Sequence, residues 1–249
     1  MVIGNAAMRT KCKSCPLAGL DSLRPMTLDQ VNFMQNFKQG EMSVGKTTQV
    51  LVEASISPHV YTVLEGILMR FKTLEDGRRQ IVNYVFPGDL LGVQGAMADP
   101  LMHGVEALSE ATLCVFSRER IIELFREQPQ LGFDMTWLSA KEESSLDEHL
   151  LALGQRTARE RITYLALFLF LRGRETGIAK GNTLRLSITQ ALIADTIGLS
   201  IVHTNRTLQS LRKSGVLEWN LDEIVIPDVE KAIAVAKYEY SVLTKRPYI

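Results

Sequence analysis

The hydrophobic pattern of this 249-residue chain changes once, near Arg118. Between residues 41 and 116, short apolar runs alternate with Gly, Pro and Asp turn residues at intervals of roughly ten residues, and Asp76-Gly77 is a strong hairpin signal. Many short, evenly spaced strands predict a β-barrel or jelly roll. Beyond Arg118 the apolar residues recur at the spacing of helices. We therefore predict an α+β chain in which a β-roll of the jelly-roll type precedes a helical part.

The composition excludes several classes of protein. Apolar residues make up 46% and charged residues 22% of the chain, which is typical of a globular protein. The longest dense apolar run, residues 162–171, is shorter than the roughly 20 residues that a bilayer requires. The first eight residues lack the features of a secretory leader. We therefore expect a cytoplasmic protein with no membrane partner.

Charge is distributed unevenly along the chain, although 28 basic and 28 acidic residues cancel overall. Residues 156–213 carry ten Lys and Arg against three acidic residues, whereas residues 1–155 carry 14 against 19. A basic segment beside an acidic one predicts a module that faces a polyanion.

An apolar stripe predicts a helix of about 20 residues after the roll. Two uses of this stripe remain open, a two-fold seam between two copies of the chain and packing inside one copy. The stripe consists of Leu131, Met135, Leu138, Leu146, Leu150 and Leu153.

Residues 187–200 have the spacing of a helix-turn-helix. Ser187 or Thr189 can cap a first helix, and Ala194 is small where a second helix must cross closely. Gly198 supplies the turn four residues later, and a second helix begins at Ser200. Residues 216–219 and 223–226 then predict a β-hairpin, which would form the wing of a winged helix-turn-helix. The alternative is a helical hairpin that contacts no nucleic acid.

The second helix of this motif has one face suited to a major groove. We expect Ile201, Leu208 and Leu211 to point inward. Arg206 is the candidate for specificity, because arginine can donate two hydrogen bonds to guanine. The other candidate DNA contacts are Asn205, His203, Gln209, Val202 and Ser200, with Thr189, Thr204, Arg212 and Lys213 expected at phosphates.

Nearly the whole chain resembles the CRP/FNR family of bacterial transcription regulators. The resemblance is carried by Gly66 at the close of a strand, the Phe-Pro-Gly-Asp-Leu-Leu-Gly turn at residues 86–92, the long helix, and residues 197–200 with 205–208. It implies a cyclic-nucleotide-binding-like roll, a dimerisation helix and a winged helix-turn-helix. It also implies a homodimer that binds a near-palindromic site on double-stranded DNA and contacts RNA polymerase.

We expect the roll not to bind cyclic AMP. Members that do so have a Glu after the glycine at position 92 and an Arg-Ser pair further on, whereas this chain has Val93 and, at residues 101–104, Leu-Met-His-Gly. A buried phosphodiester would lose charge-assisted hydrogen bonds there. Arg70, Arg78 and Arg79 are the remaining candidate anion partners, and their hairpin position favours solvated charges or a surface that contacts RNA polymerase.

Cys12, Cys15 and Cys114 resemble ligands of the [4Fe-4S] cluster in the oxygen-sensing members. The family pattern places the fourth cysteine where this chain has Asp21, which makes Asp21 the remaining candidate ligand. A structural zinc, a thiol redox pair and cysteines without a role are the alternatives.

The resemblance leaves the signal open. We predict a dimeric DNA-binding regulator, not an enzyme, that responds to oxygen or redox state through its cysteines or a cluster. The alternatives are another small-molecule effector or none and, remotely, a cupin-like metal enzyme using scattered histidines such as His103. Val202 stands where well-known members have a Glu, so the preferred half-site should differ from theirs.

We expect four segments along the chain. They are an N-terminal cysteine segment (1–25), the β-roll (26–126), the dimerisation helix (127–154, with a hinge near Gly154) and the DNA-binding domain (155–249).

Overall fold

The computed structural model describes residues 10–96, 100–239 and 245–249. These residues form two compact units, each of which is assembled from separate stretches of the chain. The first contains the described residues up to Lys72, those of Val85–Glu143, and the segment 245–249. The second contains Thr73–Tyr84 and the described residues from Ser144 to Glu239.

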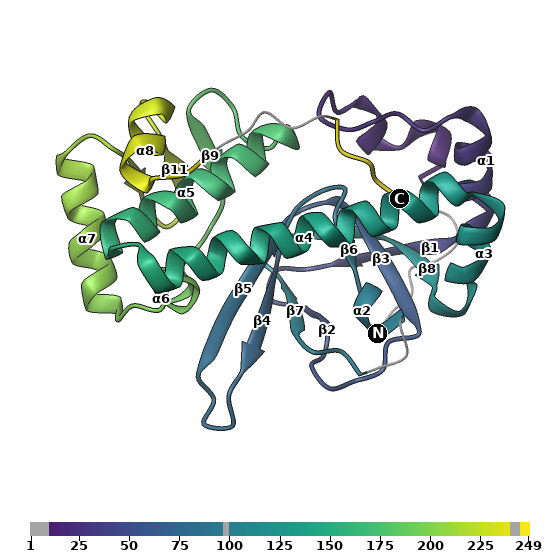
Figure 1. The fold of residues 1–249 in the computed structure, drawn as a ribbon, viewed down its shortest axis with the longest axis horizontal. Coiled ribbons are helices and arrows are strands. Elements are labelled where there is room, and N and C mark those ends of the chain that lie inside the picture. Colours follow the sequence, from purple (N-terminus) through teal and green to yellow (C-terminus); the bar gives the residue numbers. More distant parts are fainter. Residues whose placement is uncertain (1–9, 97–99, 240–244) are drawn as a thin grey trace. The chain divides into compact units, whose positions relative to one another are not determined.

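The expected β-roll is present and is built from two antiparallel four-stranded sheets (Figure 1). Strand β8 lies between β1 and β3 in the first sheet, where Val63 pairs with Leu113. Side chains from both sheets, including Val63, Leu68, Leu91 and Leu113, form a fully buried core. The first sheet has the order β1 (Lys38–Val44), β8 (Ala111–Ser117), β3 (His59–Glu65) and β6 (Leu90–Leu91), and the second has β2 (Gln49–Leu51), β7 (Gly104–Ala107), β4 (Leu68–Thr73) and β5 (Arg79–Val85).

Glycines in the left-handed region close the turns of the roll. Gly77 has φ +84° in the predicted Asp-Gly turn between β4 and β5, and Asp76 accepts a hydrogen bond from the Arg78 amide. Gly66 has φ +88° after β3, where the backbone of Glu110 passes so closely that no Cβ atom could be accommodated. The sequence prediction of both turns is confirmed.

Short helices surround the roll in the first unit. The capping box of α1 consists of Thr27, whose hydroxyl accepts from the Gln30 amide, and Gln30, whose side chain accepts from the Thr27 amide. The short helices are η2 (Cys12–Ser14), η3 (Pro16–Gly19), α1 (Leu28–Phe37), α2 (Val93–Ala96), η4 (Arg118–Arg120) and α3 (Ile121–Glu127).

Helix α4 (Pro129–Gln155) has 27 residues and is longer than the helix of about 20 residues that the stripe predicts. In its first half, Leu131, Met135 and Leu138 are at most 5% exposed and belong to a core cluster of the first unit, so this half packs inside one copy of the chain. In its second half, Leu146 and Leu150 are 38% and 69% exposed. Gly154, the predicted hinge, lies inside the helix, directly before its last residue.

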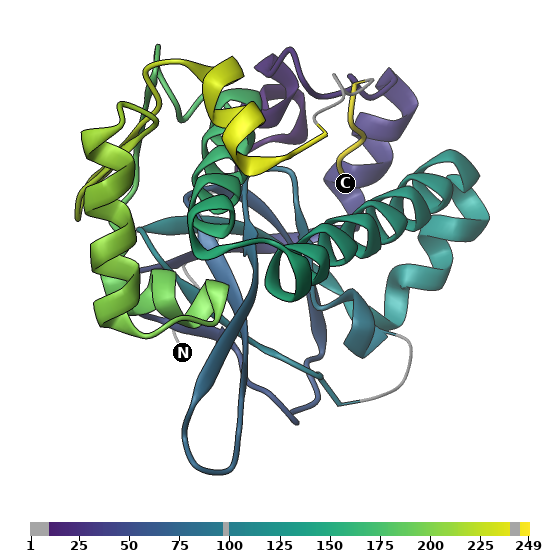
Figure 2. The ribbon, with the colours of Figure 1, turned by 60° about the vertical axis from the view of Figure 1, so that its left-hand side comes forward.

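The second unit contains the predicted winged helix-turn-helix (Figures 1 and 2). Its longest helix after α4 is α5, which begins with a capping box between Thr157 and Glu160 and is buried along most of its length. The wing strands β10 and β11 form a three-stranded antiparallel sheet with β9. The elements are α5 (Ala158–Glu175), β9 (Thr183–Arg185), α6 (Gln190–Ile197), α7 (Ile201–Lys213), β10 (Glu218–Trp219), β11 (Glu223–Val225) and α8 (Val229–Ala236).

Among the described residues, every helix is too short or too polar to span a bilayer.

Substitution of Gly66 by alanine should destabilise the roll strongly. A left-handed backbone costs a non-glycine residue about 1–2 kcal/mol, and the new Cβ atom would lie 2.4 Å from the Glu110 carbonyl oxygen. We expect Gly66→Ala to lower the free energy of unfolding by about 3 kcal/mol or more in urea titrations. Gly77→Ala is the matched control, because the described residues leave its Cβ position open and only the backbone cost applies. Equal losses in the two variants would contradict this account.

Candidate nucleic-acid interface

Two side-chain caps and one glycine set the geometry between α6 and α7. Thr189 caps α6 by accepting a hydrogen bond from the Leu192 amide at 3.2 Å. Gly198 ends the helix in the left-handed region, with φ +66°. Ser200 then caps α7 by accepting from the His203 amide at 3.2 Å. Each cap satisfies a helix N–H that would otherwise lack a partner, so the turn is closely defined.

The inner face of α7 differs from the prediction at two positions. Leu208 and Leu211 are buried as expected, but Ile201 is 50% exposed, so its predicted inward position is wrong. Thr204 is fully buried one turn before Leu208, and its hydroxyl has no hydrogen-bond partner in the part of the chain that the structure describes. We therefore remove Thr204 from the expected phosphate contacts, because its hydroxyl is not accessible.

The outer face of α7 carries the remaining candidate residues. The side chain of Asn205 is half-buried, and its Oδ1 atom is shielded from solvent. Arg212 pairs with Glu218 of the wing at 3.6 Å, an exposed ion pair that is worth little in water. Exposed residues at or near this face are Ser200, Val202, His203, Arg206, Gln209, Arg212 and Lys213.

Two cations that the sequence reasoning missed hold the end of α7. Arg159 of α5 donates to the Ser214 hydroxyl at 2.7 Å and to the Ser210 hydroxyl at 3.3 Å. Lys231 of α8 donates to the carbonyls of Ser214 and Gly215 at 2.8 and 3.2 Å. A cation at a helix C-terminus stabilises the negative end of the helix dipole. Spacing could not have revealed these contacts, because α5, α7 and α8 are far apart in the sequence.

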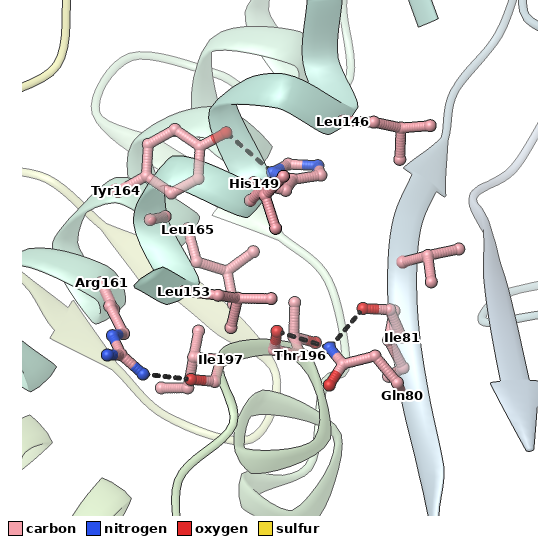
Figure 3. Close-up of a pocket in the computed structure, with 13 residues that line it drawn as sticks. Gln80, Ile81, Leu146, His149, Leu153, Arg161, Tyr164, Leu165, Thr196 and Ile197 are labelled. Atoms are coloured by element: carbon pink, nitrogen blue, oxygen red, sulfur yellow. Dashed lines mark hydrogen bonds between the residues drawn. The ribbon is translucent and has the colours of Figure 1, made fainter. Parts of the chain in front are cut away.

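Strand β5 contacts the first helix of the motif within the second unit (Figure 3). The Tyr84 hydroxyl lies 2.7 Å from the Thr196 hydroxyl. The side-chain amide of Gln80 donates to the Thr196 carbonyl at 2.9 Å. Arg79 lies 3.9 Å from Asp195. These contacts fix α6 against β5 within the second unit.

A buried polar chain runs from β5 through α4 to α5. His149 lies 3.0 Å from the Asn83 side-chain oxygen and 2.7 Å from the Tyr164 hydroxyl. The Phe168 ring packs edge-on against the imidazole. Burial, with a smaller effect from the Arg156 charge, lowers the pKa of His149 to about 4. The imidazole is therefore neutral at pH 7.

A cavity of about 150 Å³ lies beside this chain in the second unit (Figure 3). Leucines 146, 150 and 153 of α4 and Ile197 of α6 supply much of its mainly apolar lining. The exposed half of the α4 stripe therefore borders an apolar hollow.

The three cysteines lie close together around a buried lysine in the first unit. The Lys38 ammonium donates to Glu41 Oε1 at 2.6 Å and to the Thr10 carbonyl at 2.9 Å, and it also contacts the Cys114 thiol. Burial raises the pKa of Cys114 to about 12 and also raises those of Cys12 and Cys15. All three thiols are unpaired and protonated at pH 7.

These residues do not fit a four-ligand iron–sulfur cluster. Asp21, the candidate fourth ligand, is exposed in a turn, and the ammonium of Lys38 lies among the thiols. Within residues 10–96, 100–239 and 245–249, the structure forms no group of three or more Cys, His, Asp or Glu side chains arranged to hold a metal ion.

The arginines of the roll differ from one another. Arg78 is solvated and pairs with Asp76 at 2.8 Å, as expected. Arg70 is mostly buried, and it pairs with Glu142 of α4 at 2.7 Å and donates to the Leu90 carbonyl at 3.0 Å. The predicted solvation of Arg70 is wrong, because its strand faces α4.

Comparisons with known proteins agree with this architecture. A family profile described as "Cyclic nucleotide-binding domain" matches residues 41–128, and one described as "Crp-like helix-turn-helix domain" matches residues 150–231. The nitrogen fixation regulation protein FixK of Bradyrhizobium diazoefficiens is 32% identical over 216 residues, which cover 86% of this chain and 84% of that protein. The transcriptional activator protein FnrL of Cereibacter sphaeroides is 27% identical over 216 residues, which cover 83% and 84%.

Among solved structures, FixK2 from Bradyrhizobium japonicum superposes with a TM-score of 0.71 at 24% identity, covering 80% of this chain and 98% of that one. The fold and the turn-linked pair α6–α7 define a DNA-binding transcription regulator. The chain belongs to the CRP/FNR family.

The two histidines with lowered pKa values, His149 and His103, should make stability depend on pH. A histidine in the unfolded chain has a pKa near 6.5, whereas that of His149 is about 4 in the folded protein. Between these values only the unfolded chain takes up the proton, so the free energy of unfolding falls as the pH is lowered, by roughly 3 kcal/mol at most per histidine.

Urea titrations between pH 7 and pH 4 can test this dependence. We expect His149→Gln to reduce the slope, and His103→Gln to do the same, because burial also lowers the pKa of His103 to about 4. His203→Gln is the control, since His203 is exposed on α7. A slope that is equal in the wild type and in His149→Gln would contradict the assignment.

Proposed function

We propose that the chain is a sequence-specific, dimeric regulator that inserts α7 into the major groove of double-stranded DNA. The observation that carries this proposal is the division of α7 into a buried apolar face and an exposed face of cationic and amide side chains. The positive charge of the surrounding sequence supports it, because phosphate attraction provides most of the non-specific affinity for DNA. The relatives FnrL and FixK are named as regulators, which supports a regulatory role and not a catalytic one.

The proposed contacts fall into two groups. Arg206 reads a guanine through two hydrogen bonds, and Asn205, His203 and Gln209 read neighbouring bases. Val202 is 68% exposed and can contact a thymine methyl but cannot accept a hydrogen bond from cytosine, so the half-site differs from those of members with a Glu there. Ser200, Thr189, Arg212 and Lys213 are proposed at phosphates.

A second copy of the chain is the proposed partner of the exposed half of α4. Leu146, Leu150 and Leu151 are 38%, 69% and 46% exposed. A two-fold pairing of these side chains would bury them and would present two α7 helices to a near-palindromic site. The proposal includes contact with RNA polymerase in the cytoplasm. It also includes activation of transcription, because the relative FnrL is named a transcriptional activator.

We assign the signal to the thiols and not to a cluster. Cys12 and Cys15 are half-buried and have the spacing of a redox pair, whereas the surrounding groups do not fit four-ligand iron coordination. Their raised pKa values make the thiols slow nucleophiles, since the thiolate is the reactive form. Another small-molecule effector, or none, is the alternative. Cyclic AMP is not proposed, because the Arg-Ser position is occupied by Leu101, which is 1% exposed, and by Met102.

A metal-dependent enzyme in the roll receives no support from the described residues. The Nε2 atom of His103 is buried, but the structure does not bring a second and third ligand to it among the residues it describes. We retain the segments 1–25, 26–126, 127–154 and 155–249 as the proposed domain organisation. The segment 245–249 nevertheless packs in the first unit.

Arg206→Ala and Lys213→Ala should affect DNA binding differently. Loss of a bidentate base contact should reduce discrimination between specific and random duplexes about ten- to a hundredfold. Loss of a phosphate contact should weaken binding to both duplexes similarly and reduce the salt slope by about one. Fluorescence anisotropy over a range of salt concentrations measures both effects, with Lys46→Ala in the roll as the control. Wild-type behaviour of both variants would refute the proposed interface.

Leu150→Asp should prevent association without unfolding the chain. Burying a leucine is worth about 1.5–3 kcal/mol. A two-fold interface contains Leu150 from both copies, so the substitution loses this free energy twice. The dimer Kd should therefore rise by at least roughly two orders of magnitude. Sedimentation equilibrium gives the Kd, and circular dichroism checks the fold. Leu221→Asp is the matched control, since Leu221 is 55% exposed in the wing turn. A dimer of unchanged affinity would exclude this seam.

A further inference from the structure

The segment 245–249 returns to the first unit and lies against its N-terminal cysteine segment (Figures 1 and 2). Arg246 forms a parallel bridge with Leu23. The Arg24 amide donates to the Arg246 carbonyl at 2.7 Å, and the Arg246 amide donates to the Ser22 carbonyl at 2.8 Å. The segment is therefore held in the manner of a short added strand.

Side chains fix the position of the segment further along. The Arg246 guanidinium pairs with Asp89, and the two side chains are 12% and 13% exposed. Asp89 also accepts from the Phe86 amide at 2.8 Å, so its carboxylate is already oriented by the turn that it closes. The Thr62 hydroxyl donates to the Ile249 carbonyl at 2.6 Å, on the face of β3 opposite to the core between the two sheets. These contacts hold the segment in a defined direction and register.

The segment covers the half-buried thiols. Tyr248 and Ile249 are 5% and 6% exposed and belong to the core cluster against which Cys12 and Cys15 pack. Burial raises the pKa of the Tyr248 phenol to about 12, with smaller contributions from Cys15 and Cys12. Pro247 is also buried. The segment and the two half-buried cysteines therefore meet in one core cluster.

We propose that residues 245–249 form a strap that these contacts hold in place. The strap controls chemical access to Cys12 and Cys15. It belongs to the same chain as these cysteines. The hydrogen bonds and the Arg246–Asp89 ion pair that hold the strap each contribute modestly, so the strap can open without unfolding the roll. This inference goes beyond the proposed function, because it holds whether or not the chain binds DNA.

The strap also gives the second unit a second covalent attachment. The chain leaves the first unit within α4 and re-enters it at the strap. Opening the strap would therefore expose the thiols and free the C-terminal attachment of the unit that carries α7.

Alkylation of the native full-length protein tests the strap. Iodoacetamide is added, and the modification rate of each cysteine is followed by peptide mass spectrometry. Arg246→Ala removes the ion pair and should raise the rates at Cys12 and Cys15 about tenfold or more. Lys245→Ala is the matched control and should behave as the wild type, because Lys245 is exposed. Cys114 reports on the fold, since it is 7% exposed in β8.

A second variant ends after Lys245, and the peptide KRPYI is added to it in trans. We expect the peptide, but not a scrambled one, to restore slow alkylation of Cys12 and Cys15. Unchanged rates in Arg246→Ala would overturn the proposal. A parallel increase at Cys114 would also overturn it, because the segment would then be ordinary core. If the slow alkylation of Cys12 and Cys15 is lost when the wild-type protein is diluted, the proposal is also overturned. The segment that covers the thiols would then belong to a second copy of the chain.

Discussion

Helix α4 is the constraint on which the rest of the structure depends, because a single apolar stripe serves both units. Its first half packs Leu131, Met135 and Leu138 into the core that also contains Phe37, Cys114 and Phe116. Its second half contributes His149 to the polar chain of the second unit and leaves Leu150 exposed. Each half of the helix is therefore fixed by contacts within its own unit.

The second unit joins a strand of the roll to the helix-turn-helix through polar contacts. Asn83, His149 and Tyr164 form a chain in which each group has a partner, and Tyr84 and Gln80 contact Thr196 of α6. Buried polar groups are costly when they lose a partner, so such networks favour one arrangement over near alternatives. The position of α6 in turn sets that of α7, because Gly198 and Ser200 leave little freedom between them.

At the cysteine site, the charge of the buried Lys38 ammonium opposes metal coordination by the three thiols. Three thiols near one another could suggest metal coordination, but the buried Lys38 ammonium lies among them and is compensated by Glu41. Burial keeps the thiols protonated, and the exposed Asp21 does not complete the set. The same thiols pack against the core cluster that contains Tyr248, which is the basis of the proposed control of their reactivity by access.

The sequence by itself determined the roll, the long helix and the winged helix-turn-helix, because strand and helix periods, capping residues and glycine turns are local signals. It also predicted the outer face of α7, with two exceptions. Ile201 was expected to point inward but is exposed, and Thr204 was expected on the outer face but is buried. Only the tertiary structure decided that Arg70 pairs with Glu142, that Lys231 caps α7, that Lys38 lies among the thiols, and that residues 245–249 cover Cys12 and Cys15. These contacts join residues that are distant in the chain, and no local pattern encodes them, because packing and charge compensation are settled only when the elements meet.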